Sequence, residues 1–137
     1  MELDENDLKN LRINETYILK QFISFCENNN LKYFMAFGSL LGTIRHQGFI
    51  PWDDDIDVMM PRKDYDKFID CFMATKRNDL FLQTHITDSE FQYNYAKIRL
   101  NNTVFLEVGS NHSSIHNEIF IDIFPMDNVK KDNISKI

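Results

Sequence analysis

The sequence predicts one α/β or α+β domain, and three features of the chain support this fold class. Apolar residues recur at helical spacing near the N-terminus and again around residue 68. Short apolar or alternating runs, bounded by Gly, Pro or Asn, separate and follow these helical segments. The chain has 137 residues, 43% of them hydrophobic and 13% aromatic, which is enough material for one packed core. We therefore expect a single domain over residues 1–137 in which helices flank a sheet.

Two amphipathic helices carry the helical pattern. The first runs from Leu8 to Cys26, with Asp4 or Asn6 as its N-terminal cap, and the second surrounds Phe68. A third, shorter segment, LLGTIRH at 40–46, is long enough for one or two helical turns. Four apolar residues of the two main stripes should be buried against the sheet: Leu19, Phe22, Phe68 and Phe72.

Six segments have the composition of strands. The most apolar of these segments follow a loop or a turn and end at a proline or a polar residue. Pro61 and Pro125 are two such ends. A turn at Asn101-Asn102 should join two of the strands into a hairpin. The predicted strands are 33–37, 56–60, 80–84, 91–100, 103–108 and 119–124.

Composition limits the possible function. The formal charge of −6 disfavours a nucleic-acid partner, because phosphate backbones bind to basic surfaces. Cys26 and Cys71 lie in helical patterns and suggest no disulfide framework, so we expect a reducing, cytoplasmic environment. No apolar run approaches the roughly 20 residues of a membrane span, and the acidic N-terminus lacks a signal core.

The segment WDDDID at 52–57 is the most informative stretch of the sequence. Side chains alternate at the start of a strand, so Asp53, Asp55 and Asp57 should point one way and Asp54 the other. Carboxylates two residues apart on one face can hold a hard divalent cation, and Mg²⁺ suits a site with few protein ligands. A solvated acidic loop explains the segment about equally well by itself. A calcium loop does not, because it requires Gly directly after the third acidic position and a distant Glu, whereas Val58 and Met59 follow here.

Two further features favour a phosphate site. Gly38-Ser39 directly follows a predicted strand, where backbone N–H groups and a hydroxyl can approach a phosphate, although an ordinary turn is the simpler interpretation. Asp122 lies in the apolar run IFIDIF, where a carboxylate is costly unless it is paired or binds metal. Its alternative role is an edge-strand residue facing water. The acidic segment, Gly38-Ser39 and Asp122 together indicate a phosphate site more specifically than any one of them does.

The stretch FGSLLGTIRHQGFIPWDDDIDVMMPRKDYDKF at 37–68 closely resembles the LicD family, whose relatives include the fukutin-related ribitol-phosphate transferases. YAKIRLNNTVFLE at 95–107 and IFIDIFPMD at 119–127 resemble later motifs of the same family. The resemblance implies a nucleotidyltransferase-like mixed sheet flanked by helices. It also implies transfer of a phospho-group, often phosphocholine from CDP-choline, to a hydroxyl of a cell-surface glycan such as lipopolysaccharide or teichoic acid. Family members usually continue further, so we expect residues 1–137 to be an N-terminal core that lacks the family's downstream part.

The resemblance also assigns site residues. Gly38 and Ser39 match the family's Gly-Ser turn, where the donor pyrophosphate would bind. Asp55 and Asp57 match its metal pair, and Asp122 its third carboxylate, which would share a Mg²⁺ (or Mn²⁺) ion or take the proton of the acceptor hydroxyl.

Several cations and aromatic residues complete the expected site. Three basic side chains match family positions and would offset charge on the leaving nucleotide, namely Arg45, Lys97 and Arg99. Without the resemblance each would be an ordinary surface residue, and His46 is as well explained by a structural role. Aromatic side chains can stack on a base or enclose a choline ammonium, although packing is their commoner role; the candidates are Trp52, Tyr93 and Tyr95. No His or Cys spacing predicts a zinc site.

Two other functions fit parts of the sequence. A sugar-nucleotide glycosyltransferase also uses Asp-x-Asp, but it usually builds a nucleotide-binding βαβ region first, and only one strand is predicted before Asp55. A decayed, non-catalytic binding module is the alternative that is not an enzyme. It fits the short chain, whereas the three retained carboxylates argue against it.

Overall fold

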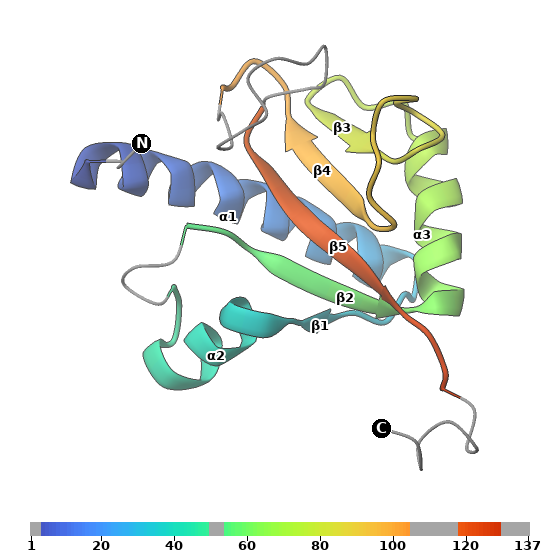
Figure 1. The fold of residues 1–137 in the computed structure, drawn as a ribbon, viewed down its shortest axis with the longest axis horizontal. Helices are drawn as coiled ribbons and strands as arrows, with labels where there is room; N and C mark the ends of the chain where they lie inside the picture. The colour runs from blue at the N-terminus through green and yellow to red at the C-terminus, as the bar shows by residue number, and fades with distance from the viewer. Residues whose placement is uncertain (1–3, 50–53, 105–117, 130–137) are drawn as a thin grey trace.

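The computed structural model describes residues 4–49, 54–104 and 118–129. Within these ranges three helices and five strands follow one another along the chain (Figure 1). Their order and bounds are α1 (Glu5–Asn28), β1 (Phe34–Met35), α2 (Phe37–His46), β2 (Asp57–Pro61), α3 (Arg62–Ala74), β3 (Leu80–Gln83), β4 (Ala96–Leu100) and β5 (Phe120–Met126).

The strands form one mixed sheet in the order β1-β2-β5-β4-β3. The pair β2 and β5 is parallel, and the other three neighbouring pairs are antiparallel. The parallel pair brings the segment after the acidic cluster beside the chain's last described strand. The predicted fold class, a mixed sheet flanked by helices, is therefore confirmed.

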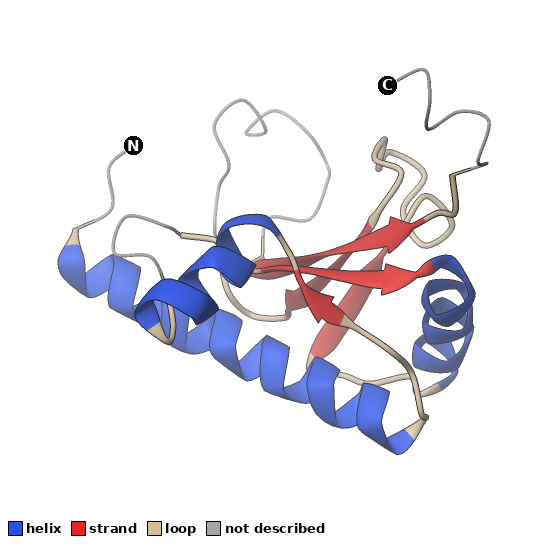
Figure 2. Cartoon of the chain, turned by 90° about the horizontal axis from the view of Figure 1, so that it is seen from below, coloured by secondary structure: helices blue, strands red, loops and turns tan. Residues whose placement is uncertain are grey.

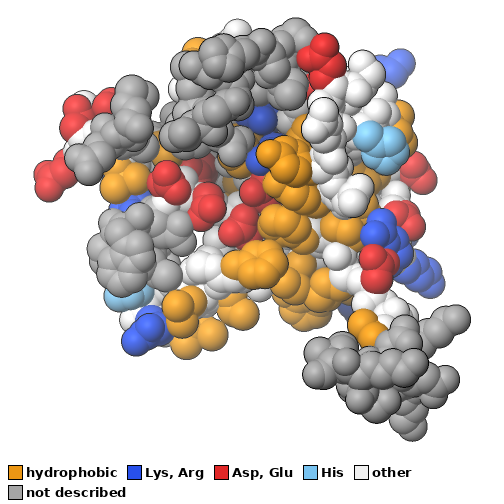
Figure 3. Space-filling view, in the orientation of Figure 1, with side chains coloured by type: hydrophobic (Ala, Val, Ile, Leu, Met, Phe, Trp, Pro, Cys, Tyr) orange, Lys and Arg blue, Asp and Glu red, His pale blue; other side chains and the backbone are white. Residues whose placement is uncertain are grey.

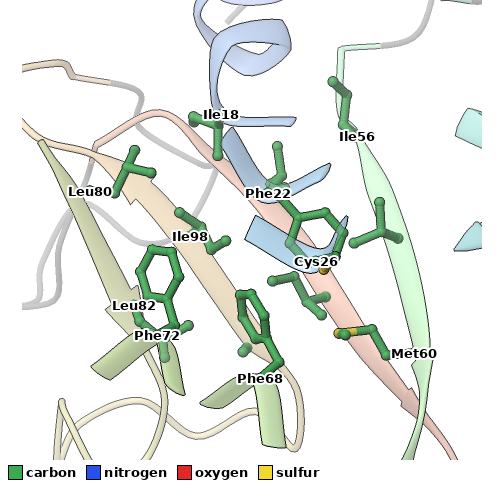
Figure 4. Packing of buried hydrophobic residues seen from close by; sticks show 14 of the residues in the cluster. Ile18, Phe22, Cys26, Ile56, Met60, Phe68, Phe72, Leu80, Leu82 and Ile98 are labelled. Atoms are coloured by element: carbon green, nitrogen blue, oxygen red, sulfur yellow. The ribbon is translucent and has the colours of Figure 1, made fainter. Parts of the chain in front are cut away.

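The core lies between the sheet and two helices. Helix α1 runs along one face of the sheet, and α3 meets it on that side (Figure 2), where Phe68 of α3 packs edge-on against Phe22 of α1. Phe22, Phe68 and Phe72 are almost fully buried, and Leu19 is half-buried against the same cluster, as their helical spacing predicts. Alternate residues of the strands, such as Ile98 and Met60, fill the space beneath them (Figure 4).

Helix α1 begins at the first of its two candidate caps. The Asp4 carboxylate accepts a hydrogen bond from the Asp7 backbone N–H at 2.7 Å, which satisfies one of the unpaired donors of the first turn. Acidic residues in this turn, Glu5 and Asp7, also complement the positive end of the helix dipole.

The first predicted strand is shorter than expected. Only Phe34 and Met35 pair with β2, and Phe37 already starts α2 with a left-handed φ of 50°. This backbone conformation is costly for a residue with a bulky side chain, at about 1–2 kcal/mol. It turns the chain abruptly from strand into helix, so that Gly38-Ser39 lies in the first helical turn.

The predicted strands after residue 90 also differ. Only Ala96–Leu100 of the predicted 91–100 strand pairs with neighbours, because Phe91, Tyr93 and Tyr95 form an irregular aromatic cluster instead. Thr103 and Val104 are not in a strand, and residues 105–108 lie outside the described residues. The neighbours of β4 are β3 and β5.

Pro125 does not end its strand. It lies inside β5, opposite Met60 of β2. The pairing of β4 with β5 extends only to Ile123, so at Pro125 the strand has a single neighbour. A proline is tolerated there because the missing N–H is not required on the open side.

No helix in the described ranges is long and apolar enough to cross a membrane. Cys26 is buried and Cys71 is half-buried, and both are free thiols, which agrees with the expected lack of a disulfide framework. The predicted cytoplasmic location stays a prediction.

Candidate functional site

Two of the predicted acidic residues lie side by side on the sheet. Asp57 of β2 is the register partner of Asp122 of β5 on the neighbouring parallel strand. Paired residues of adjacent strands point to the same side of a sheet, and their neighbours Val58 and Ile123 are fully buried on the helix-covered side. Asp57 and Asp122 therefore share the opposite face, which we call the open face.

The row continues across the sheet with two more polar residues. Lys97 of β4 is the register partner of Asp122, and Gln83 of β3 is the register partner of Lys97. We call these four residues, Asp57, Asp122, Lys97 and Gln83, the polar row. None of the four is more than 9% exposed, so each charge requires a partner within the protein.

Lys97 supplies that partner for Asp122. Its Nζ donates to Asp122 Oδ1 at 2.7 Å, and the two side chains are only 3% and 12% exposed. The Lys97 ammonium also lies 3.5 Å from the centre of the Phe120 ring. The alternative role of Asp122, an edge-strand residue facing water, is therefore excluded, because Asp122 is a paired residue on a strand with neighbours on both sides.

Arg99 is held inside the protein by other groups. Its Nε donates to Gln83 Oε1 at 2.7 Å, and its Nη1 donates to the Glu118 carbonyl oxygen at 2.6 Å. Gln83 in turn donates from Nε2 to the Asp88 carboxylate at 2.9 Å. We did not predict a role for Gln83, because it is a single polar residue at the end of the apolar strand LFLQ and no sequence pattern marks it.

The Gly38-Ser39 turn meets the acidic residues at Asp57. Ser39 Oγ accepts a hydrogen bond from the Asp57 backbone N–H at 2.8 Å, and the Ala36 N–H donates to the Asp57 carbonyl oxygen at 3.0 Å. These two contacts fix the first turn of α2 against the start of β2. The Ser39 hydroxyl still has its own proton to donate, because Oγ acts here as the acceptor.

Asp55 lies beside the same turn. A pocket of about 210 Å³ is lined by Gly38, Ser39 and Asp55, with Thr43 and Phe49 among the other contributors. Asp55 is half-buried and Asp54 is exposed, and both precede β2, which begins at Asp57. The structure thus brings the predicted phosphate turn and the first carboxylate of the Asp-x-Asp pair to one pocket.

The other predicted residues lie at the end of α2, beside Lys97 of the polar row, or outside the described ranges. Arg45 and His46 are exposed in the last turn of α2, about 9 Å along the helix axis from Ser39 for Arg45. Trp52 and Asp53 lie outside the described residues. Tyr93 and Tyr95 stack on each other, with ring centroids 5.1 Å apart.

The acidic residues fit a divalent cation with few protein ligands. Within the described ranges, no three His, Cys, Asp or Glu side chains form a group that could hold a metal ion, so the convergence of Asp55, Asp57 and Asp122 on one point is not found there. Asp57 and Asp122 are nevertheless adjacent, and Mg²⁺ is commonly bound by one or two carboxylates with water and substrate phosphate. The contact with Lys97 shows that Asp122 already accommodates a positive charge.

Comparison with known proteins gives a consistent answer. The model of the LicD family, described as the LicD/FKTN/FKRP nucleotidyltransferase domain, matches residues 30–136. A lipopolysaccharide cholinephosphotransferase LicD of Haemophilus influenzae is 43% identical over 67 residues, which is 49% of this chain and 25% of that protein. An uncharacterised protein of Rickettsia typhi is 37% identical over 68 residues, 45% of this chain and 22% of the relative.

An uncharacterised protein of Rickettsia prowazekii is 43% identical over 47 residues, 34% of this chain and 18% of the relative. The matched segments thus span a quarter or less of the length of these curated relatives. The family match covers the Gly-Ser turn, the acidic pair and the strand with Asp122, and it includes well over half of the chain. This chain therefore belongs to the LicD family of nucleotidyltransferase domains.

Proposed function

We propose that the protein is a phosphotransferase that moves a phospho-headgroup, phosphocholine from CDP-choline, onto a hydroxyl of a cell-surface glycan such as lipopolysaccharide. The observation that carries the proposal is the adjacency of Asp57 and Asp122, with Ser39 bonded to the backbone of Asp57. A turn suited to phosphate thereby meets two adjacent carboxylates suited to a cation at the start of β2. The Haemophilus relative is a lipopolysaccharide cholinephosphotransferase, and this activity suggests the proposed headgroup and acceptor.

The donor phosphates are proposed to bind at the first turn of α2. Backbone N–H groups at a helix N-terminus, together with the positive end of its dipole, attract anions. The turn is held in place because Ser39 Oγ is bonded to the Asp57 N–H at 2.8 Å.

Asp57 and Asp122, with Asp55 nearby, would hold a Mg²⁺ or Mn²⁺ ion that neutralises phosphate charge during transfer. Lys97 pairs with Asp122 and fixes the orientation of its carboxylate through the 2.7 Å contact. Arg99 fixes Gln83 at the far end of the polar row, which limits the freedom of Lys97's neighbours. The proposed contributions of Lys97 and Arg99 are therefore positioning rather than direct contact with the nucleotide.

The proposed reaction is one substitution at phosphorus. The acceptor hydroxyl oxygen forms a bond to the phosphorus of the headgroup, and the bond from that phosphorus to the CMP oxygen breaks, so CMP leaves. The hydroxyl proton passes to a carboxylate of the site, for which Asp55 is the candidate because it lines the pocket beside Ser39. Positioning and charge neutralisation account for most of the catalysis in this class of reaction.

Binding and transfer can be measured separately. Calorimetric titration should show that CDP-choline binds with Mg²⁺ present and binds much more weakly in EDTA, whereas CDP-choline with lipopolysaccharide should yield CMP. Asp57→Asn is the informative variant, because the Ser39 contact uses the Asp57 backbone and survives the change. We expect it to fold normally and to lose both the Mg²⁺ dependence and CMP release. CDP-choline binding that is identical with Mg²⁺ and EDTA would contradict the proposed metal site.

A further inference from the structure

A chain of aromatic rings lies next to the polar row on the open face. Phe37 of α2 packs on Phe124 of β5 with ring centroids 5.2 Å apart, and Phe124 contacts Tyr95 at 4.4 Å. Tyr95 stacks on Tyr93 at 5.1 Å. We call these four residues, Phe37, Phe124, Tyr95 and Tyr93, the aromatic wall. It joins a helix, a central strand and the segment before β4, which are far apart in sequence.

The aromatic wall is one step along the strands from the carboxylates. Phe124 follows Asp122 by two residues and Tyr95 precedes Lys97 by two, so each lies on the same face as the polar row. Two residues of a strand span about 7 Å, so the aromatic wall adjoins the carboxylates of the polar row. Hydrophobic and acidic side chains accordingly gather side by side on this face of the molecule (Figure 3).

The wall is exposed where ordinary packing would bury it. Phe37 is 61% exposed and Tyr93 is 53% exposed. Phe37 also adopts its left-handed φ of 50°, which places its ring over Phe124 at a cost in backbone strain. Exposed aromatic faces held by a strained backbone are more typical of a binding surface than of a core.

These rings already surround a cation. The Lys97 ammonium lies 5.6 Å from the centre of the Tyr95 ring and 5.8 Å from that of Tyr93, in addition to its close contact with Phe120. Its charge is balanced by Asp122. Tyr93 and Tyr95 therefore already accommodate one cation at the edge of the wall, whose charge Asp122 balances.

We propose that the aromatic wall binds the quaternary ammonium group of the donor and selects it over a primary amine. A trimethylammonium group has no N–H to donate, so ring faces and nearby carboxylates are its best partners, whereas a primary ammonium group retains stronger hydrogen bonds to water. The inference rests on the proposed function, because it assumes that the phosphate of the same donor lies over the polar row.

The test uses choline itself and compares it with ethanolamine. Proton NMR follows the choline N-methyl signal, which aromatic rings should shift upfield as choline is titrated against the protein. We expect choline to bind about tenfold more tightly than ethanolamine, the order of one good ring contact. Tyr95→Leu should weaken choline binding about tenfold, whereas Tyr95→Phe keeps the ring and should stay within about twofold of wild type.

Two further variants control for folding and position. Tyr93→Leu alters a half-exposed ring and should weaken choline binding even where Tyr95→Leu folds poorly. Tyr17→Leu removes a tyrosine of α1 that is 40% exposed and should leave choline binding unchanged. Equal binding of choline and ethanolamine, or unchanged choline binding in both wall variants, would overturn the inference.

The proposed function can fail independently of the aromatic wall. Selective choline binding without CMP release from CDP-choline would overturn the proposed function and support the wall. Release of CMP at equal rates from CDP-choline and CDP-ethanolamine would support the transferase and overturn the wall's role in selection.

Discussion

Replacing Lys97 with methionine should show how much of the protein's stability depends on the ion pair between Lys97 and Asp122 in the polar row. The Nζ to Oδ1 distance of 2.7 Å corresponds to an attraction of about 6 kcal/mol at an effective dielectric constant of about 20. Desolvation of the two groups offsets part of this attraction. Removing one partner of a pair buried this deeply, at 3% and 12% exposure, nevertheless costs about 3–5 kcal/mol, because the remaining charge has no counterion. We expect Lys97→Met to lose that much stability in EDTA.

Urea unfolding followed by circular dichroism measures this loss. The double variant Lys97→Met/Asp122→Asn should recover most of the stability, since it leaves no unpaired charge. Mg²⁺ at 100 times its dissociation constant should return about 2.7 kcal/mol to Lys97→Met and less to wild type, in which Lys97 already neutralises Asp122. A Lys97→Met protein that unfolds at the same urea concentration as wild type would refute the reasoning that the pair is buried and stabilising.

Three smaller changes test other parts of the account. Ser39→Ala removes the acceptor of the Asp57 N–H and should cost about 1–2 kcal/mol in urea unfolding, with weaker CDP-choline binding. Arg77 holds the pKa of Asp79 at about 2, below its usual 3.8, so that pair stabilises the fold above about pH 4. The stability difference between wild type and Asp79→Asn, measured by urea unfolding at several pH values, should therefore disappear as the pH falls through 2. Asp55→Asn should be as stable as wild type in EDTA, because it relieves repulsion, and less stable than wild type with Mg²⁺ in thermal melts.

The helical period of apolar residues predicted α1 and α3 well, because the apolar stripe of each helix packs against a single buried surface. Phe22, Phe68 and Phe72 follow the helical period and all reach the core. The cap at Asp4 was also accessible from sequence, since a short polar side chain before an apolar period is a local signal. Features that depend only on residues close together in the sequence were therefore predictable.

The strands were predicted less well because pairing depends on distant partners. The alternation of Phe91, Tyr93 and Tyr95 has the period of a strand, yet these rings contact one another and Phe124 outside the β ladder. Pro125 would end a strand with two neighbours, but here β5 has only one at that position. Neither outcome can be derived without the sheet order.

The candidate site also combines features that the sequence predicts with features that depend on the folded sheet. Gly38, Ser39, Asp57 and Asp122 were singled out from sequence, and their adjacency follows from the parallel pairing of β2 with β5. The ion pair of Lys97 with Asp122 was not predicted, because β4 and β5 meet only in the folded sheet. The aromatic wall was missed as a unit for the same reason.

The most direct test of the proposed metal site is to locate a bound Mn²⁺ ion. In proton–nitrogen NMR spectra, Mn²⁺ broadens the amide signals nearest to it, so a titration maps the ion without any assay of activity. The account predicts that broadening begins at residues 55–58 and 121–123, and that Asp57→Asn abolishes it while its spectrum otherwise remains folded. Broadening that instead centres on other acidic groups, such as Asp66, Asp70 and Asp127 around the pocket beside α3, would contradict the claim that Asp57 and Asp122 hold the ion.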